Sequence, residues 1–137
     1  MKVLVAGADG LIGSRLVEKL RARGDEAVAL VRKRRAGSAG VRTWDELPAP
    51  LEGADAAVNL AGASIAGRRW SEAWKREIRD SRVGTTRALV EAMRALSPRP
   101  RAFIGGSAIG IYGSRGDELL DESTTPGDNF LTGICRD

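Results

Sequence analysis

The sequence predicts an α/β fold built as a doubly wound parallel sheet with helices on both faces. Short apolar runs alternate along the chain with segments whose apolar residues recur at helical spacing. A glycine motif, Gly7-x-x-Gly10-x-x-Gly13, lies where the first apolar run ends and the first helical segment begins. Strands that alternate with helices pack as a parallel sheet, so this order of elements fixes the fold class.

The first 31 residues supply two strands and a helix. Residues 1–6 contain a continuous apolar run, typical of a parallel strand covered on both faces. Apolar residues return at helical spacing through 11–23, and Gly24 provides the C-terminal stop. The apolar run 26–31 is the second strand.

The next segment adds two strands and a long helix. A short third strand is expected at 41–44, and the proline-containing stretch DELPAP that follows must be a loop or a single turn. Residues 55–60 form the fourth strand, and residues 70–96 form a helix with one broad apolar face. Gly84 in its middle predicts a kink or a close contact, because glycine costs about 1 kcal/mol against alanine there.

The last segment supplies a fifth strand at 101–107, a glycine-rich loop from Ile111 and the start of a helix near Asp128. Right-handed crossovers bring the carboxyl ends of the strands to one edge of the sheet, which is where such folds bind ligands. The residues expected at that edge are Gly7, Arg32, Gly62 and Gly106.

Length and composition indicate one globular domain, residues 1–137, with 42% hydrophobic and 29% charged residues. No apolar run is long enough to span a membrane, and no signal peptide is visible. The single cysteine, Cys135, fits a cytoplasmic protein, and the absence of histidine excludes His-based triads and most zinc sites. We therefore expect no metal site and no membrane partner.

The glycine motif predicts a dinucleotide site. Gly7 permits the tight turn, Gly10 lets the backbone approach a pyrophosphate, and Gly13 lets helix and strand pack closely. The helix N-terminus then offers free N–H groups to the phosphates. The end of the fourth strand, Asn59, Leu60, Ala61 and Gly62, would pass under the adenosine side of the cofactor. The alternatives are a tight turn without a ligand and a plain strand-to-loop turn.

The basic run Arg32–Arg35 indicates which dinucleotide binds. An NAD site would have a carboxylate after the second strand, whereas this chain has Arg32, whose guanidinium suits a 2′-phosphate. We expect NADP (NADPH), with Arg32 as the direct contact and the rest of the run steering the anion. The alternative is a solvated loop. Nucleic acid is not expected as a partner, because no aromatic residue interleaves with the basic run.

The chain also resembles the atypical extended short-chain dehydrogenases/reductases of the epimerase type, which have a Rossmann-like NAD(P)-binding fold. The matching stretches are GADGLIG, WDEL, DAAVNLAGASIAGRRW, SRVGTTRAL, GSAIGIYG and PGDNFLTGICRD. The resemblance implies an NADP(H)-binding oxidoreductase or epimerase whose small-molecule substrate is unknown, a sugar nucleotide being one candidate. It implies cofactor contacts at Gly10, Leu11, Ile12, Arg32, Leu60, Ala61, Glu77 and Arg82. From the residues alone, Glu77 and Arg82 would be solvated helix charges.

The catalytic set of the wider superfamily is missing from this chain. Its members use a Ser/Thr, a Tyr and a Lys, and the corresponding positions hold Ala108, Phe130 and Ile134. Ser107, one residue earlier, could hydrogen-bond the ligand or be a buried strand-end serine. Tyr112, the only tyrosine, lies in the glycine-rich loop and is expected to pack or to face the cofactor. The acid/base residue is therefore unknown.

The expected sixth strand and substrate lobe of the resembled family are not encoded in these residues. Either the chain is truncated or a partner chain covers the open sheet edge, which would make it a homo-oligomer. These observations leave three functional alternatives open. The first is a reductase or epimerase, the second is a non-catalytic NADP(H) sensor that acts on a partner, and the third is an inert fragment.

Overall fold

The computed structural model describes residues 1–34 and 40–137, so Arg35 of the basic run lies outside the described residues. The described chain forms two compact units, Met1–Gly106 and Ser107–Asp137. Each unit has its own secondary structure and its own hydrogen bonds.

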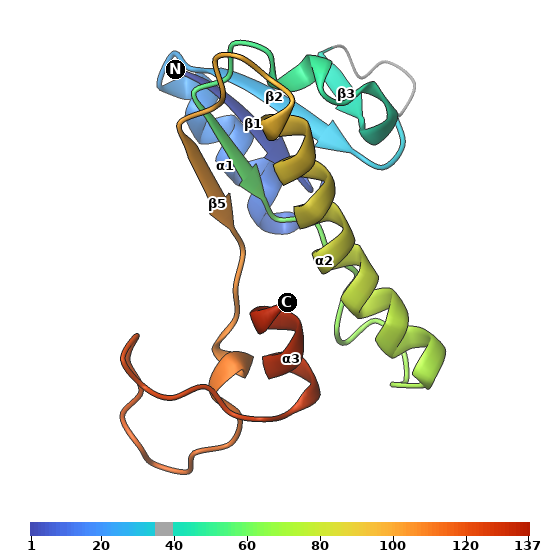
Figure 1. Ribbon diagram of the computed structural model, residues 1–137, viewed down its shortest axis with the longest axis vertical. Coiled ribbons are helices and arrows are strands. Elements are labelled where there is room, and N and C mark those ends of the chain that lie inside the picture. Colours follow the sequence, from blue (N-terminus) through green and yellow to red (C-terminus); the bar gives the residue numbers. More distant parts are fainter. Residues whose placement is uncertain (35–39) are drawn as a thin grey trace. The chain divides into compact units, whose positions relative to one another are not determined.

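The first unit is built on a five-stranded parallel sheet with the order β3-β2-β1-β4-β5, so the predicted fold class is confirmed (Figure 1). The central strand is β1 (Lys2–Ala6), in which Val5 pairs with Ala29 on one side and Val58 on the other. The other strands are β2 (Glu26–Val31), β3 (Val41–Thr43), β4 (Ala56–Asn59) and β5 (Ala102–Gly105). Since all strands run parallel, their carboxyl ends share one edge, as predicted.

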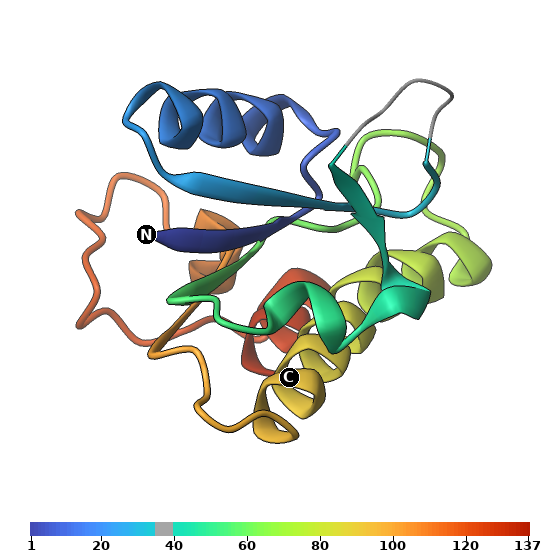
Figure 2. The same cartoon turned by 90° about the horizontal axis from the view of Figure 1, so that it is seen from above.

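Helices cover both faces of this sheet (Figure 2). The helix α1 (Leu11–Ala22) packs Val17 against the face formed by Val3, Val5 and Val58. The helix α2 (Glu72–Arg94) packs Leu89 against the opposite face, where Leu4 and Leu30 are fully buried. The continuous apolar run of β1 is therefore explained by burial on both sides.

The DELPAP stretch was expected to be a loop or a single turn, but it contributes to two short 3₁₀ turns, η1 (Trp44–Glu46) and η2 (Ala49–Leu51). Helix α2 also corrects an expectation. It runs unbroken through Gly84, and no atom lies within 4 Å of the position that a Cβ would take there. The close contact predicted at this glycine is absent, because Gly84 lies on the exposed side of the helix.

The second unit contains a 3₁₀ turn, η3 (Ile109–Tyr112), and the helix α3 (Phe130–Arg136). Asn129 caps α3 by accepting a hydrogen bond from the backbone N–H of Thr132 at 2.9 Å. The fully buried hydroxyl of Thr132 donates to the carbonyl of Ile111 at 2.9 Å and so joins the helix to the turn. Within the described residues of both units, no helix is long and apolar enough to cross a membrane.

Candidate functional site

The glycine turn, residues 7–13, connects β1 to α1 through backbone geometry. Gly7 has φ +75°, which L side chains rarely adopt, and its N–H donates to the carbonyl of Leu30 at 3.1 Å. A Cβ on Gly7 would lie 2.7 Å from the backbone of Leu60, and a Cβ on Gly13 would collide with the carbonyl oxygen of Gly7. The close approach of the backbone therefore requires glycine at both of these positions of the motif.

The glycine turn leaves the start of α1 open. Gly10 is the N-cap residue, and no side chain caps the helix there. The first N–H groups of a helix have no partner within it, so this end offers hydrogen-bond donors and a partial positive charge. Leu11 and Ile12, the next two residues, are 86% and 68% exposed. These features suit a bound anion with an apolar neighbour.

The β4–α2 loop, residues 60–71, faces the same edge and is held by side chains. Asn59, at the end of β4, is only 5% exposed. Its amide nitrogen donates to the hydroxyl oxygens of Thr85 and Thr86 in α2 at 3.2 and 3.0 Å. Its amide oxygen accepts from the N–H of Ala61 at 3.1 Å. One buried side chain thus connects the strand end, the loop and the helix.

A second set of hydrogen bonds continues this attachment. The Ser81 hydroxyl accepts from the N–H of Ala63 at 2.9 Å, and the Arg82 guanidinium donates to the Ala63 carbonyl at 3.0 Å. Arg82 also donates to the carbonyl of Ile78, and a Cβ on Gly62 would lie 2.9 Å from its guanidinium carbon. These contacts and those of Asn59 form the clasp, which consists of Asn59, Ser81, Arg82, Thr85 and Thr86.

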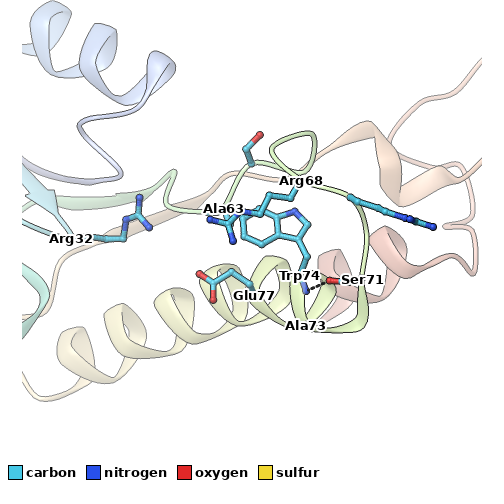
Figure 3. A pocket seen from close by; sticks show the side chains of 10 residues that line it. Arg32, Ala63, Arg68, Ser71, Ala73, Trp74 and Glu77 are labelled. Carbon is cyan, nitrogen blue, oxygen red and sulfur yellow. Dashed lines mark hydrogen bonds between the residues drawn. The ribbon is translucent and has the colours of Figure 1, made fainter.

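A pocket of about 590 Å³ opens between the end of β2, the β4–α2 loop and the first turns of α2 (Figure 3). It brings Arg32, Gly62 and Glu77 together, three residues singled out by the sequence. Its lining residues are Arg32, Gly62, Ala63, Ser64, Arg68, Arg69, Ser71, Ala73, Trp74 and Glu77.

The pocket carries an excess of positive charge. Arg32, Arg68 and Arg69 contribute three guanidinium groups, and Glu77 contributes the one carboxylate of its lining. Among the described residues, no carboxylate forms an ion pair with any of these three arginines. An anionic ligand would therefore be attracted to this pocket and neutralise charge that the protein leaves unpaired.

Glu46 connects the segments that follow β2 and β3. Its carboxylate accepts from the N–H of Thr43 at 2.6 Å and from Arg42 and Arg34 at 3.0 and 2.8 Å. The hydrogen bond from the Thr43 backbone, followed by the one from Arg42, lowers the pKa of Glu46 from 4.5 to about 2. Arg34, part of the basic run, is therefore bound to a protein carboxylate, whereas Arg32 is not.

The other sequence-predicted residues lie at the glycine turn, in the clasp and in the second unit. Gly7 and Gly13 shape the glycine turn, and Leu60 and Ala61 lie against Gly7. Arg82 lies beside the pocket with its guanidinium in the clasp. Ser107 belongs to the second unit and is exposed, so it is not a buried strand-end serine.

The positions expected for a Ser-Tyr-Lys set all lie in the second unit. Ala108 precedes η3, Phe130 is the first residue of α3, and Ile134 in that helix is 8% exposed. Their side chains carry no ionisable group. Among residues 1–34 and 40–137, no cluster of three or more His, Cys, Asp or Glu side chains is arranged to hold a metal ion.

Sequence reasoning missed the contribution of the β4–α2 loop. Arg68, Arg69 and Trp74 line the pocket, although the sequence singles out the two arginines only within the family-like stretch 55–70 and Trp74 only as part of the apolar face of the expected helix. The signal for the arginines is the basic pair in GRRW, placed after a strand end. The pairing of NLAG with SRVGTT was also invisible, because hydrogen bonds between segments about 26 residues apart leave no local periodicity.

Comparison with known proteins gives a consistent result. The family model described as NAD dependent epimerase/dehydratase family matches residues 3–132. An epimerase family protein of Mycobacterium bovis is 39% identical over 139 residues, covering 98% of this chain and 46% of that protein. The epimerase family protein SDR39U1 of Homo sapiens is 39% identical over 131 residues, covering 93% of this chain and 44% of its own length. The chain thus spans about half the length of these relatives.

Solved structures agree with this fold. A crystal structure of human epimerase family protein SDR39U1 with NADPH matches with a TM-score of 0.87 and 36% identity, covering 98% of this chain and 46% of that one. A nucleoside-diphosphate sugar epimerase from Corynebacterium glutamicum matches with a TM-score of 0.82 and 38% identity, covering 99% of this chain and 29% of that one. Both likenesses extend over nearly all of the present chain.

Proposed function

Because the chain belongs to the NAD dependent epimerase/dehydratase family, we propose that it binds NADP(H) at the carboxyl edge of its parallel sheet. The observation that carries the proposal is the position of Arg32. This arginine follows β2, where an NAD site would have a carboxylate, and lines a pocket together with Gly62 and Glu77. The human relative crystallised with NADPH supports the same choice of cofactor.

In this proposal the glycine turn and the β4–α2 loop bind different parts of the dinucleotide. The glycine turn and the open start of α1 receive the pyrophosphate, with backbone N–H groups of Gly10, Leu11 and Ile12 as donors. Arg32 meets the phosphate on the adenosine ribose, and Leu60 and Ala61 lie under the adenosine side. In this arrangement Glu77 and Arg82 border the cofactor from α2. Ser107 is proposed as a further hydrogen-bonding residue.

The proposal includes a reaction for the whole protein, which is an oxidoreductase or epimerase acting on a small molecule. NADP(H) supplies hydride transfer when it is bound. The residues of this chain bind and orient the cofactor. A sugar nucleotide fits the substrate class, because the Corynebacterium glutamicum relative is described as a nucleoside-diphosphate sugar epimerase. We place the protein in the cytoplasm, where its single cysteine, Cys135, stays reduced.

A second candidate function is a non-catalytic NADP(H) sensor. It is favoured by Phe130 and Ile134, which stand where a Tyr and a Lys would be needed and cannot transfer a proton. The two functions differ in turnover. A screen of NADPH oxidation over small carbonyl compounds and of epimerisation over sugar nucleotides should find activity for an enzyme, whereas a sensor binds NADPH and stays silent throughout.

The first experiment is a titration of the purified protein with NADPH and with NADH, in which binding is monitored by intrinsic tryptophan fluorescence. We expect tighter binding of NADPH, and Arg32→Ala should reduce that preference at least tenfold, since a charge-assisted hydrogen bond to phosphate is lost. Arg76→Ala is the matched control, because Arg76 is an exposed arginine of α2 that does not line the pocket. Failure of both nucleotides to bind would refute the proposal.

A further inference from the structure

The β4–α2 loop brings a second arginine to the pocket that holds Arg32. Arg68 comes from a segment more than thirty residues further along the chain, yet both guanidinium groups line the same pocket. In Figure 3 the Arg68 side chain lies over the Trp74 indole, and the Arg32 and Glu77 side chains extend into the same space. Two guanidinium groups from separate segments of the chain thus line one pocket.

Trp74 holds Arg68 in this position. The guanidinium carbon of Arg68 lies 5.0 Å from the centroid of the Trp74 ring, within the range of a cation–π contact. Trp74 is itself anchored at the start of α2, where its backbone N–H donates to the hydroxyl of Ser71 at 3.2 Å. This contact favours one position of the long Arg68 side chain in the absence of a ligand, which reduces the entropy cost of binding through it.

In the part of the chain that the structure describes, the Arg68 guanidinium contacts the Trp74 ring but no carboxylate. Among the described residues, neither Arg68 nor Arg32 forms an ion pair. Arg34, in contrast, is paired with Glu46. The pocket therefore holds positive charge that no described carboxylate neutralises, which points to an anionic occupant.

Building on the proposed function, we propose that Arg68 is a second reader of the 2′-phosphate of NADP(H), shared with Arg32, and that Trp74 is the residue that positions it. A phosphate monoester carries close to two negative charges at neutral pH and has three acceptor oxygens, so it can accept from two guanidinium forks at once. Specificity for NADP over NAD then comes from two loops of the sheet edge instead of one.

The test uses two probes that differ only in the phosphate group at issue, adenosine 2′,5′-bisphosphate and adenosine 5′-monophosphate. Their affinities for the purified protein are measured by isothermal titration calorimetry. The readout is the ratio of the two affinities, which a general weakening of the pocket leaves unchanged. Arg68→Gln is compared with Arg32→Gln and with Arg76→Gln, the exposed arginine of α2 outside the pocket.

We expect Arg68→Gln to lower this ratio about tenfold, by an amount comparable to Arg32→Gln, while Arg76→Gln leaves it unchanged. If Arg68→Gln weakens both probes equally, Arg68 contacts a part of the nucleotide that both probes share, and the assignment to the 2′-phosphate is wrong. If only Arg32→Gln changes the ratio, the inference fails while NADP(H) binding by this protein stands. If the unmodified protein binds neither probe nor NADPH, the proposed function fails and the inference fails with it.

Variants of Trp74 test the positioning role separately. Trp74→Phe keeps an aromatic face under the guanidinium, whereas Trp74→Leu removes it. We expect Trp74→Leu to lower the affinity ratio several-fold and Trp74→Phe to lower it less. Circular dichroism and thermal unfolding of each variant show whether the fold is intact. An equal ratio in Trp74→Leu and the unmodified protein, with the fold intact, would remove Trp74 from the proposal.

Discussion

The two loops that meet at the carboxyl edge of the sheet are stabilised in different ways. The glycine turn is held by backbone alone, with Gly7 at a positive φ and Gly13 packed against its carbonyl oxygen. The β4–α2 loop is held by side chains: those of α2 bind Asn59 and Ala63, and the Asn59 side chain in turn accepts from the N–H of Ala61. The glycine turn has no space for a side chain at Gly7 or Gly13, whereas the β4–α2 loop depends on particular hydroxyl, amide and guanidinium groups.

The glycine turn therefore depends on the shape of its backbone, whereas the β4–α2 loop depends on its side-chain contacts. Backbone packing fixes the N–H groups of the glycine turn, whatever the neighbouring side chains are. The clasp instead positions a loop whose own residues, Arg68 and Arg69 among them, line the pocket and make none of the clasp's hydrogen bonds. Under the proposed function, the general part of dinucleotide binding lies in the glycine turn, and the cofactor-selective part lies in Arg32 and in residues of the clasped loop.

The largest expected effect comes from adding one methyl group to the glycine turn. Gly13→Ala should destabilise the protein by about 3 kcal/mol, because the new Cβ collides with a backbone oxygen that cannot rotate away. Gly84→Ala is the matched control and should stabilise the protein by about 1 kcal/mol, since it is an exposed helical glycine with open space around it. Urea unfolding measures both, and equal effects of the two substitutions would contradict the backbone account.

An intermediate effect is expected from removing the hydroxyl groups of the clasp. The double substitution Thr85→Val and Thr86→Val keeps the side-chain shape but leaves the buried amide of Asn59 without acceptors. We expect a loss of about 2 kcal/mol in the free energy of unfolding, the usual cost of a buried donor left unpaired. Thr125→Val, an exposed threonine whose side chain is outside the clasp, is the control. A loss no larger than in this control would show that the clasp carries no stability.

The smallest effect concerns pH. Hydrogen bonds from Thr43 and Arg42 hold the pKa of Glu46 at about 2 against an ordinary value of 4.5. The folded protein therefore binds this proton less readily than the unfolded chain. The stabilisation from ionised Glu46 is complete above pH 4.5 and is lost as the pH falls toward 2.

Glu46→Gln isolates that contribution. The gap in melting temperature between the unmodified protein and this variant should be present at pH 7 and should narrow as the pH is lowered below 4.5. The clasp consists of neutral groups and an arginine, so the gap caused by Thr85→Val and Thr86→Val should stay constant over the same range. A constant gap for Glu46→Gln would show that its hydrogen bonds do not depend on ionisation.

Much of the fold followed from local patterns in the sequence. The apolar run of β1, the glycine motif and the helical spacing in α1 and α2 each depend on a few neighbouring residues, and burial in a two-faced sheet produces these signals directly. Their predicted ends differ from the observed ends by one or two residues, as for α2, expected over 70–96 and found over Glu72–Arg94. The kink or close contact expected at Gly84 failed because an exposed helical glycine gives the same local signal as a packed one.

The sequence by itself determined the fold class, the turn at Gly7 and the position of Arg32 after β2, because each depends on residues close together along the chain. Only the tertiary structure decided that Arg68 and Trp74 share a pocket with Arg32, that Arg34 is bound to Glu46, and that Arg82 belongs to the clasp. These relations join segments far apart in sequence. Charged and hydrogen-bonding groups on separate segments come close to one another only because the sheet brings the strand ends to one edge.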